Sequence, residues 1–415
     1  MIRSNIIFTL LGCLLLHSVA AAQSDDAREA VIRGVVKDGT TRKPIENAHI
    51  VAVQGNIGTV TNADGVFVLK IPAADRSGGV RISHIGYSEH RIPAARLSDL
   101  GEVAVVYLTP SATKLDAVTV LSGDARPIVE EALRKIPENY SDKENLFSAF
   151  YRETVQKRSR YIGVSEAVAD VYKSDYSRRN IVRDRVQIRK GRRLISQRRT
   201  DTLAVKIVGG PTLPVVMDFV KNGDLLFEAD ELNDYEFKVV GSVDFEGRPQ
   251  YIVSFRPYLL TDYSHLKGLL YIDRQSLSFT RAEFEVDLSD RDRATRAILQ
   301  KRPAGLKFRP QQIAFVVTFR QQGGKSYLNY VRSTIRFRCN WAKRMFASNY
   351  ASVAEMVMVD RHDTEVAISR KDAIGTRAIF SDMVDDYWDE DYWRDYNIIE
   401  PTESLEQAVH KLKKG

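Results

Sequence analysis

The fold of the first domain is decided by residues 32–72, which read IRGVVKDGTTRKPIENAHIVAVQGNIGTVTNADGVFVLKIP. Short apolar stretches alternate with polar residues here, as strands with one buried face do. Gly, Pro, Asn and Asp fill the intervals, and these residues favour tight turns. The pattern continues downstream and predicts a seven-strand-type β-sandwich over residues 30–110. Its predicted strands span residues 30–36, 48–53, 58–61, 66–72, 80–87 and 102–108.

Specific residues at fixed spacing in this stretch carry a family resemblance. They are Ile32, Gly34, Val36, Asp38, Pro44, Ile45, Ala48, Ile50, Gly58, Thr59, Thr61, Gly65, Phe67, Leu69, Ser83, Ile85, Gly86 and Tyr87. With them the stretch resembles the carboxypeptidase regulatory-domain-like family, a transthyretin-like sandwich. In Bacteroidetes-type envelopes the module commonly precedes outer-membrane transporter barrels and other surface or periplasmic proteins. The resemblance implies a folding and interaction module and no peptidase activity.

Residues 1–22 have the three parts of a secretory signal peptide: a basic start at Arg3, an apolar run over 6–16 and a small-residue site ending at Ala22. The apolar run is shorter than the roughly 20 residues that a transmembrane helix needs. We therefore expect export to the periplasm or the periplasmic face of the outer membrane. An uncleaved N-terminal anchor is one alternative. Another is lipidation, because Cys13 ends a lipoprotein-box-like sequence and would anchor the chain.

Cleavage at Ala22 leaves Cys339 as the one cysteine, so the exported chain would have no intramolecular disulfide. The formal net charge of the chain is +7, and charges of both signs alternate. One basic region stands out, and we interpret it as a solvated strand face or a surface for anionic lipid head groups or acidic glycans. We expect no nucleic acid partner for an exported chain. The region comprises Arg178, Arg179, Arg183, Arg185, Arg189, Lys190, Arg192, Arg193, Arg198 and Arg199.

Residues 111–145 are predicted to be a linker with a strand at 115–120, followed by a helix that starts at Pro127 and stops at Pro137. Residues 146–370 are predicted to form a large, curved antiparallel sheet, which makes the chain mainly β. Glu246-Gly247 and Gly323-Gly324 give hairpin signals. The predicted strands span residues 147–156, 160–172, 235–243, 250–255, 268–272, 279–286, 312–319 and 327–337.

A sheet with one apolar face must be covered, and the apolar residues 211–232 are predicted to supply a helical insert. This arrangement resembles Lol-type lipoprotein carriers, which hold acyl chains in a concave cavity. Residues 268–273 and 279–283 have the paired-strand pattern that carries the resemblance. The alternative is a plain β-domain with a filled core. Apolar side chains would line any cavity, and no catalytic group is required.

The chain has no recognisable catalytic motif. Gly-x-Ser-x-Gly and His-Glu-x-x-His are both absent. His362 and Glu365 have the local spacing of a zinc carboxypeptidase, with His410 as a later histidine, but they follow the sandwich and precede a predicted strand at 366–368. We therefore predict no catalytic, cofactor-binding or metal-binding residues.

Three strand carboxylates, Glu166, Asp170 and Glu283, keep a hydrolase as the alternative, since distant Asp and Glu can meet in space. Cys339 follows a strand-like run and is predicted to be half-buried rather than catalytic.

Residues 371–415 form an acidic, aromatic segment and a last helix. The segment lacks the spacing of a calcium loop. An aromatic platform for a glycan or a partner is one interpretation. The other lays the aromatics on the main domain while the carboxylates meet the basic strands. Thr402 or Ser404 can cap the helix, whose apolar face is predicted to comprise Leu405, Ala408, Val409 and Leu412.

Together these features predict a non-enzymatic exported cell-envelope protein. The sandwich would serve as an interaction module, and the β-rich domain would bind an outer-membrane or periplasmic protein partner or an apolar, lipid-like ligand. We expect no transmembrane barrel, because the strands carry Arg and Lys on one face throughout. The alternative is a hydrolase, or a hydrolase accessory, that acts on envelope peptide or glycan.

Overall fold

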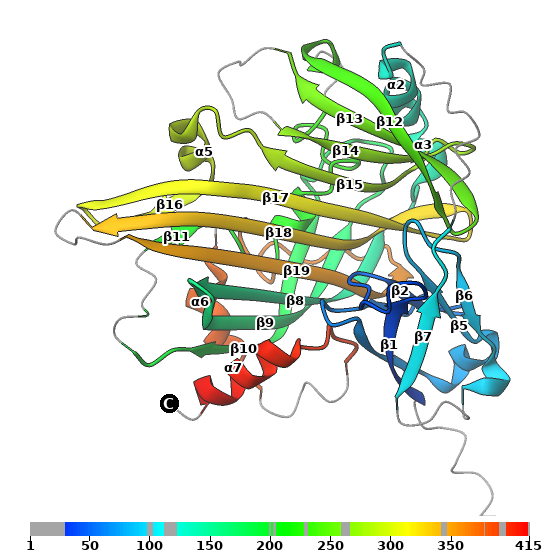
Figure 1. Cartoon of the computed structure of the whole chain (residues 1–415), viewed down its shortest axis with the longest axis horizontal. Helices are drawn as coiled ribbons and strands as arrows, with labels where there is room; N and C mark the ends of the chain where they lie inside the picture. Colours follow the sequence, from blue (N-terminus) through cyan, green and yellow to red (C-terminus); the bar gives the residue numbers. More distant parts are fainter. Residues whose placement is uncertain are drawn as a thin grey trace, which may run out of the picture.

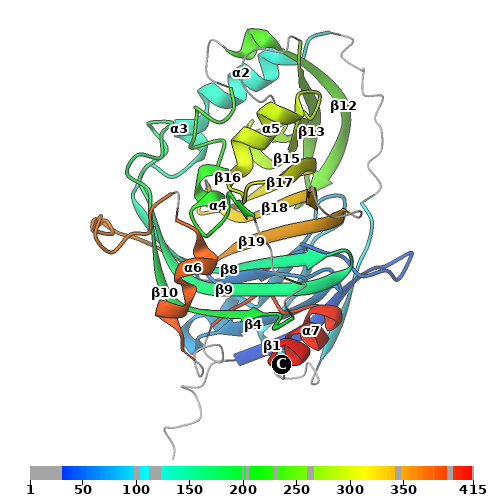
Figure 2. The ribbon, with the colours of Figure 1, turned by 90° about the vertical axis from the view of Figure 1, so that its left-hand side faces the viewer.

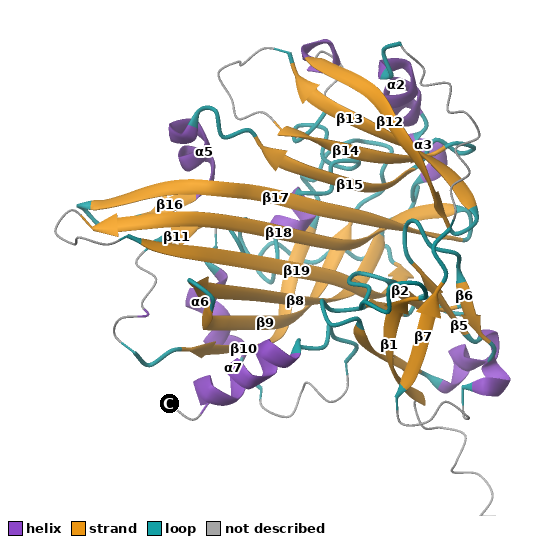
Figure 3. Ribbon diagram, in the orientation of Figure 1, coloured by secondary structure: helices purple, strands orange, loops and turns teal. Residues whose placement is uncertain are grey.

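The chain folds into a small sandwich and one large sheet, with few helices (Figures 1 and 3). The predicted mainly β class is confirmed. The predicted leader and the strand at 115–120 lie outside the described residues. The computed structural model describes residues 30–97, 103–111, 123–198, 201, 205–227, 231–258, 266–341, 347–376, 378–389 and 396–413.

The N-terminal sandwich has seven described strands in two sheets and is of the predicted type, although β6 lies in none of the six predicted strand ranges. One sheet has the order β4-β1-β7 and the other β3-β2-β5-β6. Ile32, Phe67, Leu69 and Ile82 are among the buried residues between them. The strands are β1 (Ala30–Asp38), β2 (His49–Ala52), β3 (Gly58–Val60), β4 (Val66–Ile71), β5 (Val80–Ser83), β6 (His90–Ile92) and β7 (Ala104–Leu108), with 3-10 helices η1 (Ala73–Gly78) and η2 (Ala94–Arg96).

The second domain is a ten-stranded antiparallel sheet of order β10-β9-β8-β19-β18-β17-β15-β14-β13-β12. The first and the last of these strands in the sequence, β8 and β19, pair in its interior. Both predicted hairpin turns have two residues of positive φ, Glu246-Gly247 and Gly323-Gly324. The strands are β8 (Asn145–Lys157), β9 (Arg160–Lys173), β10 (Arg185–Ile195), β12 (Tyr235–Phe245), β13 (Arg248–Pro257), β14 (Leu266–Asp273), β15 (Phe279–Val286), β17 (Leu306–Gln322), β18 (Lys325–Trp341) and β19 (Ser348–Asp363).

The sheet is strongly curved from β12 to β10, as Figure 2 shows. Residues 205–227 pack in the core together with side chains of both halves of the sheet. Phe219 is fully buried there, with its ring edge-to-face against Phe279 and Phe319. Other elements also contribute to this core, among them α2 (Arg126–Arg134), α3 (Ile136–Asn139) and α5 (Arg291–Ile298). A two-stranded pair, β11 (Lys206–Ile207) with β16 (Leu299–Lys301), lies beside it.

The predicted helical insert at 211–232 covers the sheet but is mostly not helical. Its described helices are α4 (Leu213–Val216) and the 3-10 turn η4 (Glu231–Asp234). Gly210 and Phe227 have positive φ, which no helix accommodates. The segment is buried on several sides. Its tertiary contacts therefore determine its backbone conformation, and it does not form an amphipathic helix.

Two other predictions were wrong. Residues 366–368 form no strand: β19 ends at Asp363, and Val366 is 77% exposed, so its side chain is not packed against the sheet. Pro137 does not end the first helix: α2 ends at Arg134, and Pro137 lies in the first turn of α3, where its missing N–H costs nothing.

The C-terminal segment, which is the chain from residue 371 onward, holds the sandwich on the convex face of the sheet. The side chain of Asn397 bonds both backbone groups of Lys70 in β4, accepting from its N–H at 2.7 Å and donating to its carbonyl at 3.0 Å. Ile399 packs with Val60 of β3 and Phe150 of β8. The segment continues into α7 (Glu403–Lys413), which lies below β10 in Figure 1.

Thr402 Oγ1 accepts the Leu405 N–H at 3.2 Å and caps α7, as predicted. Of the predicted apolar face, Leu405 is buried and the other three residues are partly buried. Among the described residues, no helix is both long and apolar enough to cross a membrane.

Candidate functional site

A pocket of about 240 Å³ opens on the concave face at the ends of β8, β9 and β10. The pocket results from the register in which these three strands pair. Val155 of β8 and Ile195 of β10 both pair with Gly163 of β9. A Cβ atom at Gly163 would lie 3.9 Å or more from its nearest neighbours, so the missing side chain leaves a hollow between two aliphatic ones. The apolar lining comprises Val155, Ile162, Ile195, Val205, Ile207 and Ile379.

Three of the four charged side chains in the pocket lining are paired. Arg193 bonds Asp385 at 2.8 Å, and Lys206 bonds Asp382. Asp201 bonds the Arg160 guanidinium and accepts from Ser196 Oγ at 2.6 Å. The acids that satisfy the two cations belong to α6 (Phe380–Met383) and the 3-10 turn η5 (Val384–Tyr387), which pack beside β10.

The fourth charged side chain is Glu153 of β8. Its Oε2 accepts from Tyr151 Oη at 3.0 Å, and Tyr151 Oη in turn accepts the Gly210 N–H at 3.0 Å. Among the described residues Glu153 has no ion-pair partner. Burial raises the pKa of the Glu153 carboxyl, outweighing the opposing effects of the hydrogen bonds from Tyr151 and Gly210 and of the nearby charge of Lys206.

A second candidate site is a buried ionic cluster. It fastens residues 205–227, the segment that covers the concave face of the sheet (the covering segment), to the sheet. Lys173 Nζ of β9 lies 3.1 Å from Asp184 Oδ2 and 2.9 Å from Asp218 Oδ2. Asp218 also accepts from Tyr176 Oη at 2.7 Å. Lys221 Nζ donates to the Ser174 carbonyl at 2.9 Å. Burial acts to lower the pKa of Lys173, but Asp218 and Asp184 together raise it. Because these charges satisfy one another, we assign the cluster a structural role.

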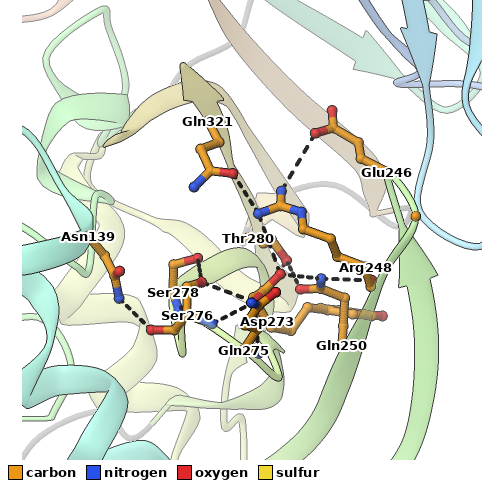
Figure 4. A network of polar contacts seen from close by, with 12 residues as sticks. Asn139, Glu246, Arg248, Gln250, Asp273, Gln275, Ser276, Ser278, Thr280 and Gln321 are labelled. Carbon is orange, nitrogen blue, oxygen red and sulfur yellow. Dashed lines mark hydrogen bonds and ion pairs between the residues drawn. The ribbon is translucent and has the colours of Figure 1, made fainter. Parts of the chain in front are cut away.

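The polar network in Figure 4 is also structural. Asp273, at the end of β14, accepts the Ser276 N–H at 2.8 Å and the Gln250 side-chain amide at 3.2 Å. Arg248 lies 3.5 Å from the same carboxylate. Asn139 of α3 donates to the Ser276 carbonyl at 2.8 Å. The network thus ties the β14–β15 turn to α3 and β13.

The structure does not bring together the three carboxylates that would support a hydrolase. Glu166 of β9 is buried between Arg152 and Arg192. Burial acts to raise its pKa, but the two guanidinium groups lower it overall. Asp170 pairs with Arg189.

Glu283, the third of these carboxylates, lies on β15, separated from β9 in the sheet by β8, β19, β18 and β17. It pairs with Arg281 at 2.7 Å.

His362, Glu365 and His410 are all exposed, the first near the end of β19 and the last on α7. Among the described residues, no group of three His, Cys, Asp or Glu side chains could hold a metal ion. Cys339 of β18 is buried, and burial raises its pKa to about 11, so its thiol stays protonated at neutral pH.

Much of the basic region lies on β10, where several of its cations pair with acids, Arg189 with Asp170 and Arg192 with Glu166 among them. Arg199 lies outside the described residues. Lys190 pairs with Asp389, and Arg193 with Asp385, both acids of the C-terminal segment. Val384 lies against Gly191, where a Cβ atom would be 2.7 Å from Val384 Cγ2. The carboxylate contacts agree with the packing interpretation of the acidic segment. Of its aromatics, Tyr387 packs against the core, Trp388 is 51% exposed, and Tyr392 and Trp393 lie outside the described residues.

The sequence alone did not single out Glu153 or Gly163. Glycine inside a predicted strand was a signal, because it often marks a bulge, a tight bend or a place where a ligand or another backbone comes close.

Ten solved protein chains match this one in the structural comparison, at low similarity. A DUF1329 family protein from Desulfovibrio piger is 10% identical with a TM-score of 0.26, over 60% of this chain and 96% of that one. MucB in complex with MucA(peri) is 10% identical with a TM-score of 0.17, over 59% of this chain and 100% of that one.

A membrane-associated protein of unknown function from Bacteroides fragilis is 8% identical with a TM-score of 0.15, over 81% of this chain and 99% of that one. No curated protein matches the chain. Residues 32–120 match the family model of the CarboxypepD_reg-like domain, so the N-terminal part of the chain carries that domain.

Proposed function

We propose that this chain is a non-enzymatic, exported cell-envelope protein whose β-rich domain binds a small, largely apolar ligand. The pocket beneath Gly163 carries the proposal. It is concave, its lining combines aliphatic side chains with a few polar groups, and the sheet forms most of its wall. This is the usual composition of a small-molecule site.

The space available on the rest of the concave face indicates a small ligand rather than a large one. Phe219, Phe227 and their neighbours fill the space beneath the centre of the sheet. The pocket of about 240 Å³ lies just below the usual range of about 300–1,000 Å³ for ligand sites. A single short chain or ring therefore fits the site better than a full lipid.

Mass spectrometry of co-purifying molecules tests the proposal. The exported chain would be purified, extracted with organic solvent and compared with a Gly163→Leu variant. The leucine fills the hollow, and its Cβ fits at 3.9 Å or more from other atoms. We expect a bound small molecule on the wild type and its loss from the variant.

Gly123→Leu is the matched control, because it adds the same side chain where nothing lies within 4 Å. It should retain the ligand. An extract without any bound molecule, or equal amounts on wild type and Gly163→Leu, would contradict the proposal. Thermal melts of all three proteins would verify that the variants are folded.

A further inference from the structure

We infer that the pocket recognises ligands with a cationic end, an ammonium or guanidinium group carried on an apolar body, and that Glu153 is the residue that pairs with that end. This inference rests on the proposed function and specifies the ligand class of the same site. The observation behind it is the charge balance of the pocket lining.

The two cations of the lining are already satisfied. Arg193 and Lys206 are paired with Asp385 and Asp382. Arg193 also donates to the Ser381 carbonyl. An anionic ligand would have to displace an acid of the C-terminal segment before either cation could bind it. The charge pattern therefore disfavours carboxylates and phosphates.

The acids of the lining are not equivalent. Asp201 has both oxygens engaged, by Arg160 and by Ser196. Glu153 accepts from the neutral donor Tyr151 at 3.0 Å and has no ion-pair partner among the described residues. Lys206 is near enough to lower the Glu153 pKa, but its own ion pair is with Asp382. Glu153 is partly buried, and a carboxylate that is partly removed from water without an ion pair loses hydration that nothing fully replaces. A ligand ammonium would offset that loss directly.

The position of Glu153 fits this role. It pairs across the sheet with Ser165 of β9, and Ser165 pairs with Arg193 of β10. Two residues further along β8 is Val155, which faces the hollow at Gly163. An apolar body in the hollow would therefore place a terminal cation next to Glu153. Burial raises the pKa of this carboxyl, so a cationic ligand would also favour its ionised form.

Calorimetric titration of the purified exported chain with three probes of equal length tests the inference: hexylamine, hexanol and hexanoate. We expect hexylamine to bind at least about tenfold more tightly than hexanol, as a charge-assisted hydrogen bond provides. Hexanoate should bind most weakly. Equal affinity for hexylamine and hexanol, or tighter binding of hexanoate, would overturn the inference without any variant being needed.

Glu153→Gln keeps the shape of the side chain and removes its charge. It should reduce the affinity for hexylamine to that for hexanol while leaving hexanol binding unchanged. Asp201→Asn, in the same lining, should leave the preference for the amine intact. Unchanged hexylamine binding by Glu153→Gln would contradict the inference.

Gly163→Leu separates the two proposals. Loss of hexanol binding in this variant supports the pocket itself, whatever the behaviour of Glu153. Hexanol binding that survives Gly163→Leu, or binding of none of the three probes to the wild type, would overturn the proposed site and the inference with it.

Discussion

Replacing Lys173 by Met should destabilise the β-rich domain more than any exposed lysine substitution. Methionine keeps the length of the side chain and removes its charge, which leaves Asp184 and Asp218 without their ammonium. Lys173 and Asp218 are both 0% exposed and Asp184 is 8% exposed, so water cannot replace the lost partner. Both ion-pair distances are short, at 3.1 and 2.9 Å.

The expected loss follows from this burial. Removing one partner of a buried ion pair costs about 3–5 kcal/mol, because the remaining charge stays desolvated. Lys221 acts on the same two carboxylates and offsets part of the loss. We therefore expect the free energy of unfolding to fall by about 3 kcal/mol, the lower end of that range.

Urea denaturation measures this loss, followed by circular dichroism in the transition in which the β-rich domain unfolds. The midpoint should fall while the slope is unchanged. Lys143→Met is the control, because Lys143 pairs with Asp363 at 3.0 Å with side chains 67% and 48% exposed. A midpoint for Lys173→Met no lower than that of Lys143→Met would refute the reasoning.

Three further predictions concern the core, the interface between the domains and the C-terminal segment. Phe219→Ala should cost about 3–5 kcal/mol in urea unfolding, because the fully buried ring leaves a cavity; a loss under about 1 kcal/mol would contradict the packing of the covering segment. Burial lowers the pKa of His49 to about 3 and that of His84 to about 4 from 6.5, so both stay neutral in the folded protein. The contribution of the two neutral histidines to the free energy of unfolding is complete above pH 6.5. It is lost as the pH falls, by up to about 1.4 kcal/mol per pH unit for each histidine. Urea midpoints measured from pH 7 to 5 should show this loss, and a double His→Gln variant should flatten it; an equally steep profile would assign it to other groups. Asn397→Ala removes two hydrogen bonds to the Lys70 backbone, so limited proteolysis should release the C-terminal segment faster than in the wild type; an unchanged rate would show that the segment is held elsewhere.

The parts of the fold that depend on local chemistry were predictable. Glu246-Gly247 reads as a hairpin turn because Gly247 adopts positive φ without steric cost, and the structure has φ of 55° at Glu246 and 73° at Gly247. The alternation over 160–172 likewise predicted β9, which spans Arg160–Lys173. The period of two in the sequence was enough to show this strand, although residues 164–169 are buried on both faces, since other parts of the chain also cover the convex face.

The conformation of the covering segment was harder to predict from the sequence than the strands were, because this segment is buried on several sides. Leu213, Val215, Phe219 and Val220 are all buried, so the apolar pattern has no single face and does not distinguish a helix from packed turns.

The candidate site depends on partners that are distant in the sequence. The hollow exists because β-strand register, shifted by bulges, sets Gly163 between Val155 and Ile195. Nothing in the sequence near Glu153 distinguishes it from Glu166. Yet Glu166 has two arginine partners, whereas Glu153 has no ion-pair partner among the described residues. Such differences arise only when the neighbouring strands and the C-terminal segment are in place.

The pairing of β8 with β19 has a consequence for how the protein must be made. These strands are more than 190 residues apart in sequence and meet in the interior of the sheet. Until residue 363 has emerged, β8 and β18 each present a long strand edge with unpaired backbone groups. Such edges invite pairing with other chains. A chain cut short before β19 would therefore carry two aggregation-prone edges, and its folding in the cell would depend on factors that keep nascent chains apart.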